Sequence, residues 1–421
     1  MTLSLETPLD ALLAARRQLG ARPIRVYIPG AAAEPLALAD QLEADSAAAG
    51  GMTFLGAWIP GVNRIDWSRF GDGAETTFSA PDWAEGRRSG RMRIRPLAYS
   101  QTWDWLATTP LDLAIVQVSP PDAAGDCNMS LTADFTAAIL ARDVPVIGLL
   151  NRALPVIAGA PSVPLSRFSW TVEVDRAPPT YDPGVEDPVT LKVAANTAAL
   201  IPDGAVIQTG IGKLGAAVFS ALTARRNLRI HSGMASDSVI DLIEAGSLAE
   251  TPGAITVGAI LGSAGLGARL ADERRLVMVP VPQTHGYATL SAINGLAAVN
   301  SAVEIDLFGQ ANAEQVGGKL ISGVGGLSDF LRGAGAAPGG LPILALPAET
   351  PNGKHSRIVA RLGAGVTTLS RTEVAIVVTE HGATDLRGLD MDRRAEALIS
   401  VAAPDRRAGL AQAWDEIRRS L

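Results

Sequence analysis

Short, almost uninterrupted apolar segments recur along this chain, separated by stretches with helical periodicity. Strands buried on both faces of a parallel sheet have this composition, because helices cover each face. The segments therefore predict an α/β fold with mainly parallel sheets. In the first half they lie at residues 24–28, 111–118 and 144–150, and in the second half at 205–208, 228–231, 255–261, 342–346 and 374–379.

A Pro-rich, acidic stretch at residues 177–188 divides two similar halves of the chain. Such composition is typical of a linker between domains. We expect a first α/β domain over residues 1–185 and a second over residues 186–421. Helical patterns are predicted at residues 34–47, 132–142, 212–222 and 405–421.

Charge and cysteine content exclude several classes of function. The chain has 421 residues and a formal net charge of −7, so a surface for nucleic acid is not expected. A single cysteine and four histidines without metal-ligand spacing predict neither a disulfide framework nor a metal site. We see no signal peptide and no apolar run of the roughly 18 residues that a membrane span needs, which predicts a cytoplasmic protein.

Glycines follow the predicted strand at residues 205–208. In Gln208-Thr-Gly210-Ile-Gly212 the backbone can approach a ligand closely, and the following helix offers free N–H groups to an anion. With Gly215 the pattern fits G-x-G-x-x-G, but the next strand ends without the acidic residue that a dinucleotide site requires. Both a ligand contact and a tight packing turn remain open.

A second glycine-rich loop spans residues 321–330 and contains Gly323, Gly325 and Gly326. Its backbone could form a nest for a carbonyl oxyanion or a phosphate; the alternative is a surface turn. Shortly before it, residues 300–307 alternate, so that Glu304 and Asp306 share one face. Such a pair is usually a solvated strand face. A carboxylate beside a glycine nest could instead attack an activated acyl group.

Two further segments contain residues that could act in binding or catalysis. Residues 379–388 follow an apolar strand and so are expected at its ligand-binding end, where Arg387 and Gly388 could meet a phosphate or a thioester. Asp385 and Arg387 could equally form a structural ion pair. Cys127 is interpreted as a small buried residue, because the sequence offers no base to activate it.

Taken together, these blocks resemble the acetyl-CoA hydrolase/transferase family, in the branch of class I CoA-transferases that includes 4-hydroxybutyrate CoA-transferases. The resemblance covers almost the whole chain. Its motifs are QVSPPDAAGDCNMSL and TVEVD in the first half, and IPDGAVIQTGIG, IHSGMASD, NSAVEIDLFGQ, ISGVGGLSDFLRGA, KHSRIV and VVTEHGATDLRG in the second.

The resemblance implies two α/β domains that face each other across a cleft, and a homo-oligomer. It implies that Glu304 is the nucleophile of a ping-pong reaction, which forms an acyl-glutamyl anhydride and then a glutamyl-CoA thioester. Acyl-CoA and small carboxylic acids are the implied substrates, without metal or other cofactor. The implied roles are an oxyanion loop at Gly323, Gly325 and Gly326, and CoA contacts at Gly388, Gln208, Gly210 and Gly212.

Other functions compete with CoA transfer. Water could intercept the anhydride at Glu304, which would make the protein an acyl-CoA hydrolase. A non-catalytic acyl-CoA-binding protein and a nucleotide-dependent oxidoreductase that uses Gly210 and Gly212 are the remaining alternatives. The resemblance also shows departures: Val156 stands where many members carry arginine, so the native acids need not be acetate or 4-hydroxybutyrate.

Overall fold

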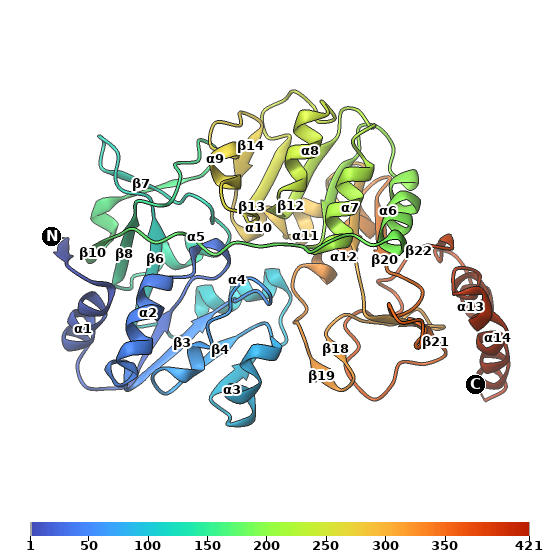
Figure 1. Cartoon of the computed structure of the whole chain (residues 1–421), viewed down its shortest axis with the longest axis horizontal. Helices are drawn as coiled ribbons and strands as arrows, with labels where there is room; N and C mark the ends of the chain where they lie inside the picture. Colours follow the sequence, from blue (N-terminus) through green and yellow to red (C-terminus); the bar gives the residue numbers. More distant parts are fainter. Residues whose placement is uncertain (1, 421) are drawn as a thin grey trace. The chain divides into compact units, whose positions relative to one another are not determined.

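A computed structural model describes residues 2–420 of the chain (Figure 1). The residues form two compact units. The first extends to Tyr181 and also takes Gly233–Ala235 and Thr251–Thr284; the second takes Asp182–Ser232, Ser236–Glu250 and the chain from His285 onward.

An eight-stranded sheet with parallel neighbours forms the framework of the first unit. The residues of its central strands β6 and β8 are all buried, as the apolar runs predicted. In spatial order the strands are β1 (Leu3–Leu5), β10 (Trp170–Val174), β8 (Val146–Asn151), β6 (Leu113–Val118), β2 (Ile24–Tyr27), β3 (Met52–Gly56), β4 (Gly73–Thr76) and β5 (Met92–Ile94).

A second eight-stranded sheet contains the apolar runs of the second half of the chain. Its last strand, β23, runs antiparallel to β22, whereas β11, β15, β20 and β22 run parallel to one another. The prediction of mainly parallel sheets is therefore confirmed. In spatial order the strands are β14 (Leu276–Met278), β13 (Ile255–Ile260), β12 (Arg229–Ala235), β11 (Val206–Thr209), β15 (Leu296–Asn300), β20 (Leu341–Ala345), β22 (Ile376–Thr379) and β23 (Gly382–Asp385).

Three small sheets complete the strands of the described chain. The first joins β17 (Ala311–Asn312), β16 (Glu304–Asp306) and β21 (Ile358–Val359); the second is a hairpin of β18 (Gln315–Val316) and β19 (Lys319–Leu320); the third pairs β7 (Asp126–Asn128) with β9 (Ser162–Pro164).

Local signals place the helix starts. Asp187 caps α6, where its carboxylate accepts the N–H of Thr190 at 2.9 Å, and Pro188 occupies the first helical position. The helices are α1 (Pro8–Leu19), α2 (Leu36–Ala44), α3 (Ala84–Arg88), α4 (Tyr99–Thr108), α5 (Thr136–Leu140), α6 (Pro188–Leu200), α7 (Lys213–Ala221), α8 (Ser238–Glu244), α9 (Leu266–Leu270), α10 (Val281–Thr284), α11 (Tyr287–Ser291), α12 (Leu327–Ala336), α13 (Met391–Ser400) and α14 (Pro404–Arg418).

Two expected elements differ from the structure. The helix predicted over residues 132–142 is only the five-residue α5, because the chain before it adopts turns and Ser130 has a positive φ of 56°. Residues 300–307 do not form one alternating strand: β15 ends at Asn300, and β16 begins at Glu304 in a different sheet.

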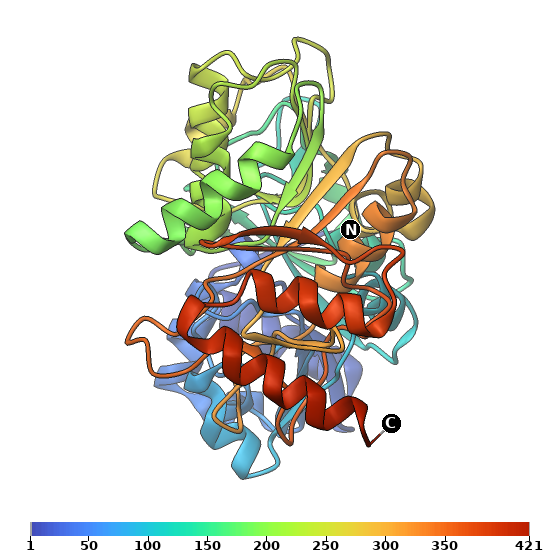
Figure 2. The same ribbon diagram turned by 90° about the vertical axis from the view of Figure 1, so that its right-hand side faces the viewer.

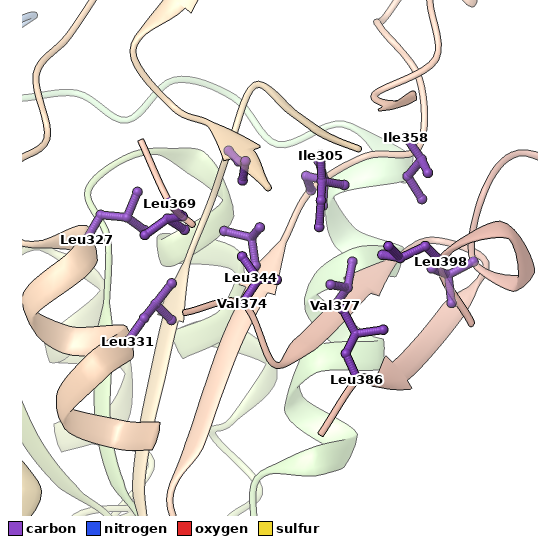
Figure 3. Close-up of a cluster of buried hydrophobic side chains, with 14 of the residues drawn as sticks. Ile305, Leu327, Leu331, Leu344, Ile358, Leu369, Val374, Val377, Leu386 and Leu398 are labelled. Atoms are coloured by element: carbon purple, nitrogen blue, oxygen red, sulfur yellow. The ribbon is translucent and has the colours of Figure 1, made fainter. Parts of the chain in front are cut away.

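The C-terminal helices α13 and α14 lie side by side, drawn in red in Figure 2. Trp414 joins them, because its indole Nε1–H donates to Asp392 Oδ1 at 2.8 Å. The same helices contribute to a large hydrophobic core in the second unit, to which β16, α12, β20 and β22 also belong (Figure 3). Within residues 2–420, no helix has both the length and the apolar character that a bilayer crossing demands.

Candidate active site

Glu304 opens β16, four residues after the end of the central strand β15. The next residue, Ile305, is fully buried in the hydrophobic core of the second unit (Figure 3). Because successive strand residues point to opposite faces, burial of Ile305 directs Glu304 away from this core. The Glu304 side chain is half-buried, which leaves its carboxylate partly accessible.

Asn312 holds the Glu304 carboxylate in place. Its Nδ2 donates to Glu304 Oε1 at 3.1 Å and to the carbonyl of Gln315 at 2.8 Å. Its Oδ1 accepts the backbone N–H groups of Glu314 and Gln315 at 3.1 and 3.0 Å. One buried amide therefore fixes both the carboxylate and the start of the β18–β19 hairpin.

Asp306 has a different role from Glu304, although the two alternate on one strand. Its carboxylate is buried and accepts the N–H groups of Phe308 and Gln310 at 3.1 and 3.0 Å, the Gln310 side-chain amide at 3.1 Å and the Leu362 N–H at 3.3 Å. These bonds close the turn after β16. The interpretation of a solvated strand face is thus wrong for Asp306, because the chain folds back onto that face.

Gln208 and Asn300 form a buried pair at the ends of the neighbouring strands β11 and β15. Asn300 Nδ2 donates to Gln208 Oε1 at 2.8 Å, and Gln208 Nε2 to Asn300 Oδ1 at 3.4 Å. Gly210 is half-buried beside this pair: a Cβ added to it would lie 3.5 Å from Asn300 Oδ1. The amide of Gln208 is therefore engaged within the protein, and its role as a CoA contact stays a prediction.

The remaining glycines of this motif set the turn into α7. Gly212 has a φ of 113°, which disfavours any other residue, and directly precedes α7. At Gly215 a Cβ would lie 2.1 Å from the carbonyl oxygen of Gly210. Gly215 is therefore required for packing of the helix against the loop, which is the packing alternative that the sequence left open.

The glycine-rich loop leads into the N-terminus of α12. Gly323, Gly325 and Gly326 are each half-buried, and Gly325 has a left-handed φ of 58°. A Cβ on Gly326 would lie 2.7 Å from Nε2 of His285, so the loop backbone rests directly on this imidazole.

His285 supports the loop from within the second unit. It is buried, and its ring lies 4.6 Å from that of Phe330 in α12, measured between centroids. Burial, and secondarily the charge of His231, lowers the pKa of His285 to about 3, so its ring is neutral at neutral pH. Neither His285 nor Asn312 was singled out from the sequence, because their importance depends on tertiary contacts.

The topology brings most of the predicted residues to one edge of the second sheet. Gln208 is the last but one residue of β11, Gly210 and Gly212 follow this strand, and Glu304 follows β15. Helix α12 packs on β15 and β20 and leads to the start of β20, so the loop before it also lies at the carboxyl edge. Ligands of open α/β sheets bind at this edge.

Gly388 is not brought to that edge. Asp385, at the end of the antiparallel β23, pairs with Ile376 at the start of β22, which places it at the amino edge of the sheet. Arg387 donates to the carbonyl of Gly340, just before β20, at 3.2 Å, and binds both carboxylate oxygens of Asp385. The expected position at the ligand-binding end is thus wrong for residues 385–388, whereas Glu380 and His381 do follow the carboxyl end of β22. The structure contains the ion pair, and the role of Gly388 as a CoA contact stays a prediction.

Cys127 is fully buried in the first unit, which confirms its interpretation as a small core residue. Burial, with the nearby charges of Asp122 and Asp126, raises the pKa of its thiol to about 11. The thiol is therefore protonated at neutral pH and is a poor nucleophile.

Comparisons with known proteins identify this α/β fold as that of an enzyme of the CoA-transferase type. Residues 262–414 match the family model of the acetyl-CoA hydrolase/transferase C-terminal domain. The chain is 36% identical over 308 residues to 4-hydroxybutyrate coenzyme A transferase of Clostridium kluyveri, which covers 72% of each protein.

Solved structures show the same fold over the whole chain. RipA from Yersinia pestis superposes with a TM-score of 0.89 at 25% identity, covering 99% of this chain and 98% of RipA. The 4-hydroxybutyrate CoA-transferase of Porphyromonas gingivalis has a TM-score of 0.80 at 28% identity, covering 100% and 98% of the two chains. The chain belongs to the acetyl-CoA hydrolase/transferase family, and its chemistry is CoA transfer or acyl-CoA hydrolysis.

Proposed function

We propose that this enzyme transfers CoA from an acyl-CoA to a carboxylic acid and that Glu304 is the nucleophile. The setting of Glu304 is the main support: its carboxylate is half-buried and held by Asn312, at the sheet edge that carries the glycine-rich loop. Asp306 provides a contrast, because its lone pairs are occupied by turn amides. A carboxylate with one fixed oxygen and spare lone pairs can attack an acyl carbon.

The proposed reaction has two symmetrical halves. A Glu304 oxygen attacks the thioester carbonyl, and the CoA thiolate leaves to give an acyl-glutamyl anhydride. The thiolate then attacks the glutamyl carbonyl, which releases the first carboxylic acid as its carboxylate and leaves a glutamyl-CoA thioester. A second carboxylate repeats these steps in reverse and departs as the new acyl-CoA. Every step conserves atoms and charge without a further cofactor.

The glycine-rich loop is suited to the charge that develops in these steps. Each tetrahedral intermediate carries an oxyanion, which backbone N–H groups in a dry site stabilise strongly. Gly323, Gly325 and Gly326 have no side chain that would keep a carbonyl from the loop backbone. The neutral ring of His285 beneath Gly326 brings no positive charge to the loop, so stabilisation of the oxyanion here is left to the backbone N–H groups.

Chemical trapping tests the nucleophile. We expect borohydride or hydroxylamine, added after an acyl-CoA, to inactivate the enzyme and to modify the peptide that contains Glu304. Glu304→Gln should not be modified, whereas Glu349→Gln, a change at another half-buried carboxylate of the second unit, should behave like the wild type. Modification of a different carboxylate would reject Glu304 while leaving CoA transfer in place.

A second measurement distinguishes transfer from hydrolysis. The enzyme is incubated with an acyl-CoA, with and without a panel of carboxylic acids, and both free CoA and new acyl-CoA are quantified. New acyl-CoA without net release of CoA supports the transferase. If, without an acceptor acid, one free CoA were released for every acyl-CoA consumed over many turnovers, the transferase would be overturned in favour of the hydrolase.

A further inference from the structure

Asn312 faces Glu304 across the small sheet that contains β16 and β17. The two residues are partners in the antiparallel register of these strands, and the Val303 N–H donates to the Asn312 carbonyl at 2.8 Å. Directly opposite residues of an antiparallel pair project from the same face. Strand pairing therefore places the buried amide of Asn312 beside the half-buried carboxylate of Glu304.

The hydrogen bonds of Asn312 leave its amide a single orientation. Oδ1 accepts two backbone N–H groups, those of Glu314 and Gln315, so this atom can only be the oxygen. Nδ2 donates one hydrogen to the Gln315 carbonyl at 2.8 Å and the other to Glu304 Oε1 at 3.1 Å. Rotation of the amide by half a turn would direct its NH₂ group at two other donors. An N–H donor is thus fixed on one oxygen of Glu304 before any substrate binds.

The two oxygens of the Glu304 carboxylate differ in their surroundings. Oε1 is held by Asn312, whereas Oε2 accepts no hydrogen bond from any residue between 2 and 420. Because the lone pairs of Oε2 are not engaged within the chain, this oxygen is available to attack the thioester in the proposed reaction. Oε1 then becomes the glutamyl carbonyl oxygen of the anhydride.

The proposed reaction forms oxyanions on two different atoms. Attack on the acyl-CoA places negative charge on the oxygen of the acyl group, whereas attack of the CoA thiolate on the anhydride places it on Oε1 of Glu304. A fixed donor at the atom where charge develops stabilises the transition state without reorganisation. Asn312 Nδ2 already contacts Oε1, so its position suits the second of these oxyanions.

We propose that Asn312 is a catalytic residue, which donates a hydrogen bond to the oxyanion on Glu304 each time the glutamyl carbonyl is attacked. The proposal rests on the proposed function, because it requires Glu304 as the nucleophile. The thiolate sulfur bonds to Cδ of Glu304, and the carbonyl electron pair moves to Oε1, beside Asn312 Nδ2. The pair then returns to form the thioester carbonyl, the bond from Cδ to Oε2 breaks, and the first acid departs as a carboxylate that contains Oε2.

Gln310 offers a matched control, because its side-chain amide also donates to a carboxylate of β16. Its Nε2 lies 3.1 Å from Asp306 Oδ2, and Asp306 accepts three backbone N–H groups in addition. Asp306 therefore stays bonded within the turn when this amide is removed. Asn312→Ala and Gln310→Ala each delete one amide donor, but only the first deletes it from Glu304.

Cleavage of a preformed glutamyl-CoA thioester isolates the relevant step. The enzyme is incubated with an acyl-CoA, small molecules are removed, and intact-protein mass spectrometry follows cleavage of the thioester by hydroxylamine, which attacks the same carbonyl. We expect Asn312→Ala to slow this cleavage by roughly a hundredfold or more, as for the loss of one oxyanion donor, and Gln310→Ala to match the wild type. Asn312→Asp keeps an acceptor for the two backbone N–H groups, so it tests the same loss if Asn312→Ala does not fold, and its cleavage should be at least as slow.

The outcomes keep this proposal separate from the proposed function. Equal cleavage rates in the wild type and in the folded Asn312 variants would overturn the role of Asn312 and leave Glu304 as the nucleophile. If the folded variants form no thioester even after a much longer incubation, Asn312 is needed to position the free carboxylate, and the assignment to the oxyanion is overturned. A wild type that forms no thioester at Glu304 would reject the proposed function itself, and this proposal with it.

Discussion

Each unit is built around a sheet of mainly parallel strands, but the carboxyl edges of the two sheets differ. In the first unit, large side chains fill this edge: Trp58 and Trp67 are fully buried there, and Glu34 accepts from Trp67 Nε1 at 3.0 Å and from Asn63 Nδ2 at 3.1 Å. In the second unit, half-buried glycines and the carboxylate of Glu304 lie at this edge. The same architecture thus supports a packed edge in one unit and an accessible backbone in the other.

Buried titratable groups show a related contrast. Burial raises the pKa of Glu34 to about 7 and that of Asp134 to about 6 in the first unit, which favours their neutral forms. In the second unit burial lowers the pKa of His285 to about 3. Burial thus favours the neutral form of each group, but the resulting dependence of stability on pH has opposite signs for the carboxyl groups and for the imidazole.

The largest expected effect comes from the same Glu→Gln change at Glu304, in the second unit, and at Glu34, in the first. Glu304→Gln should reduce transferase turnover by at least roughly a thousandfold, because an amide cannot form the anhydride. Glu34→Gln should leave the turnover of the folded enzyme unchanged and lower the free energy of unfolding by about 1–3 kcal/mol, because its NH₂ would face a buried donor. Turnover and urea unfolding of both variants check this.

An equal loss of turnover in the folded Glu34→Gln variant would contradict the contrast between the two edges. It would show that the packed edge of the first unit also takes part in the reaction. If Glu304→Gln retained its turnover, Glu304 at the edge of the second unit would not be the nucleophile.

The next effect is a dependence of stability on pH. The Asp134 pKa is raised from 3.8 to about 6, so the folded state keeps a proton that the unfolded state loses, and stability falls as the pH rises through this interval. For His285, whose pKa falls from 6.5 to about 3, the unfolded state gains a proton first, and stability falls as the pH is lowered. Each contribution is at most about 3–5 kcal/mol.

Two variants separate these opposed contributions. Asp134→Asn keeps partners for the Phe135 N–H and the Tyr99 hydroxyl, and should make stability rise more steeply between pH 4 and pH 6 than in the wild type. His285→Phe should reduce that rise. Urea unfolding at a series of pH values measures both slopes, and parallel curves for either variant and the wild type would refute the corresponding pKa shift.

The sequence was informative where a pattern depends on near neighbours. The apolar runs at residues 113–118 and 206–209 are strands because their composition alone suits a sheet buried on both faces. Gly210 and Gly212 lie at the carboxyl edge because they stand between a predicted strand and a predicted helix. These features required no knowledge of contacts between distant residues.

Other features depend on tertiary contacts that no local pattern encodes. Gly388 lies at the amino edge because β23 reverses direction, which the residues of the VVTEHGATDLRG block do not specify. Asn312 acts on Glu304 because β16 and β17 pair in one particular register. Asp306 is buried because four amides of a later turn and loop converge on it. Register, strand direction and burial therefore decided the roles of these residues.

The smallest effect is expected from alanine substitutions at two glycines, one near the start and one near the end of α12. The comparison tests whether the position of the glycine-rich loop depends on its packing against His285. Gly326→Ala should lower the free energy of unfolding by about 1–3 kcal/mol, because the new Cβ would lie 2.7 Å from the buried ring of His285. Gly335→Ala meets only Pro342 Cγ at 3.9 Å and should raise it by about 0.5–1 kcal/mol, since alanine favours a helix. Because the ring cannot move far in a packed interior, Gly326→Ala should also displace the loop and slow turnover, whereas Gly335→Ala should not. Equal stability and turnover in the two variants would mean that the His285 ring yields to the methyl group and does not determine the position of the loop.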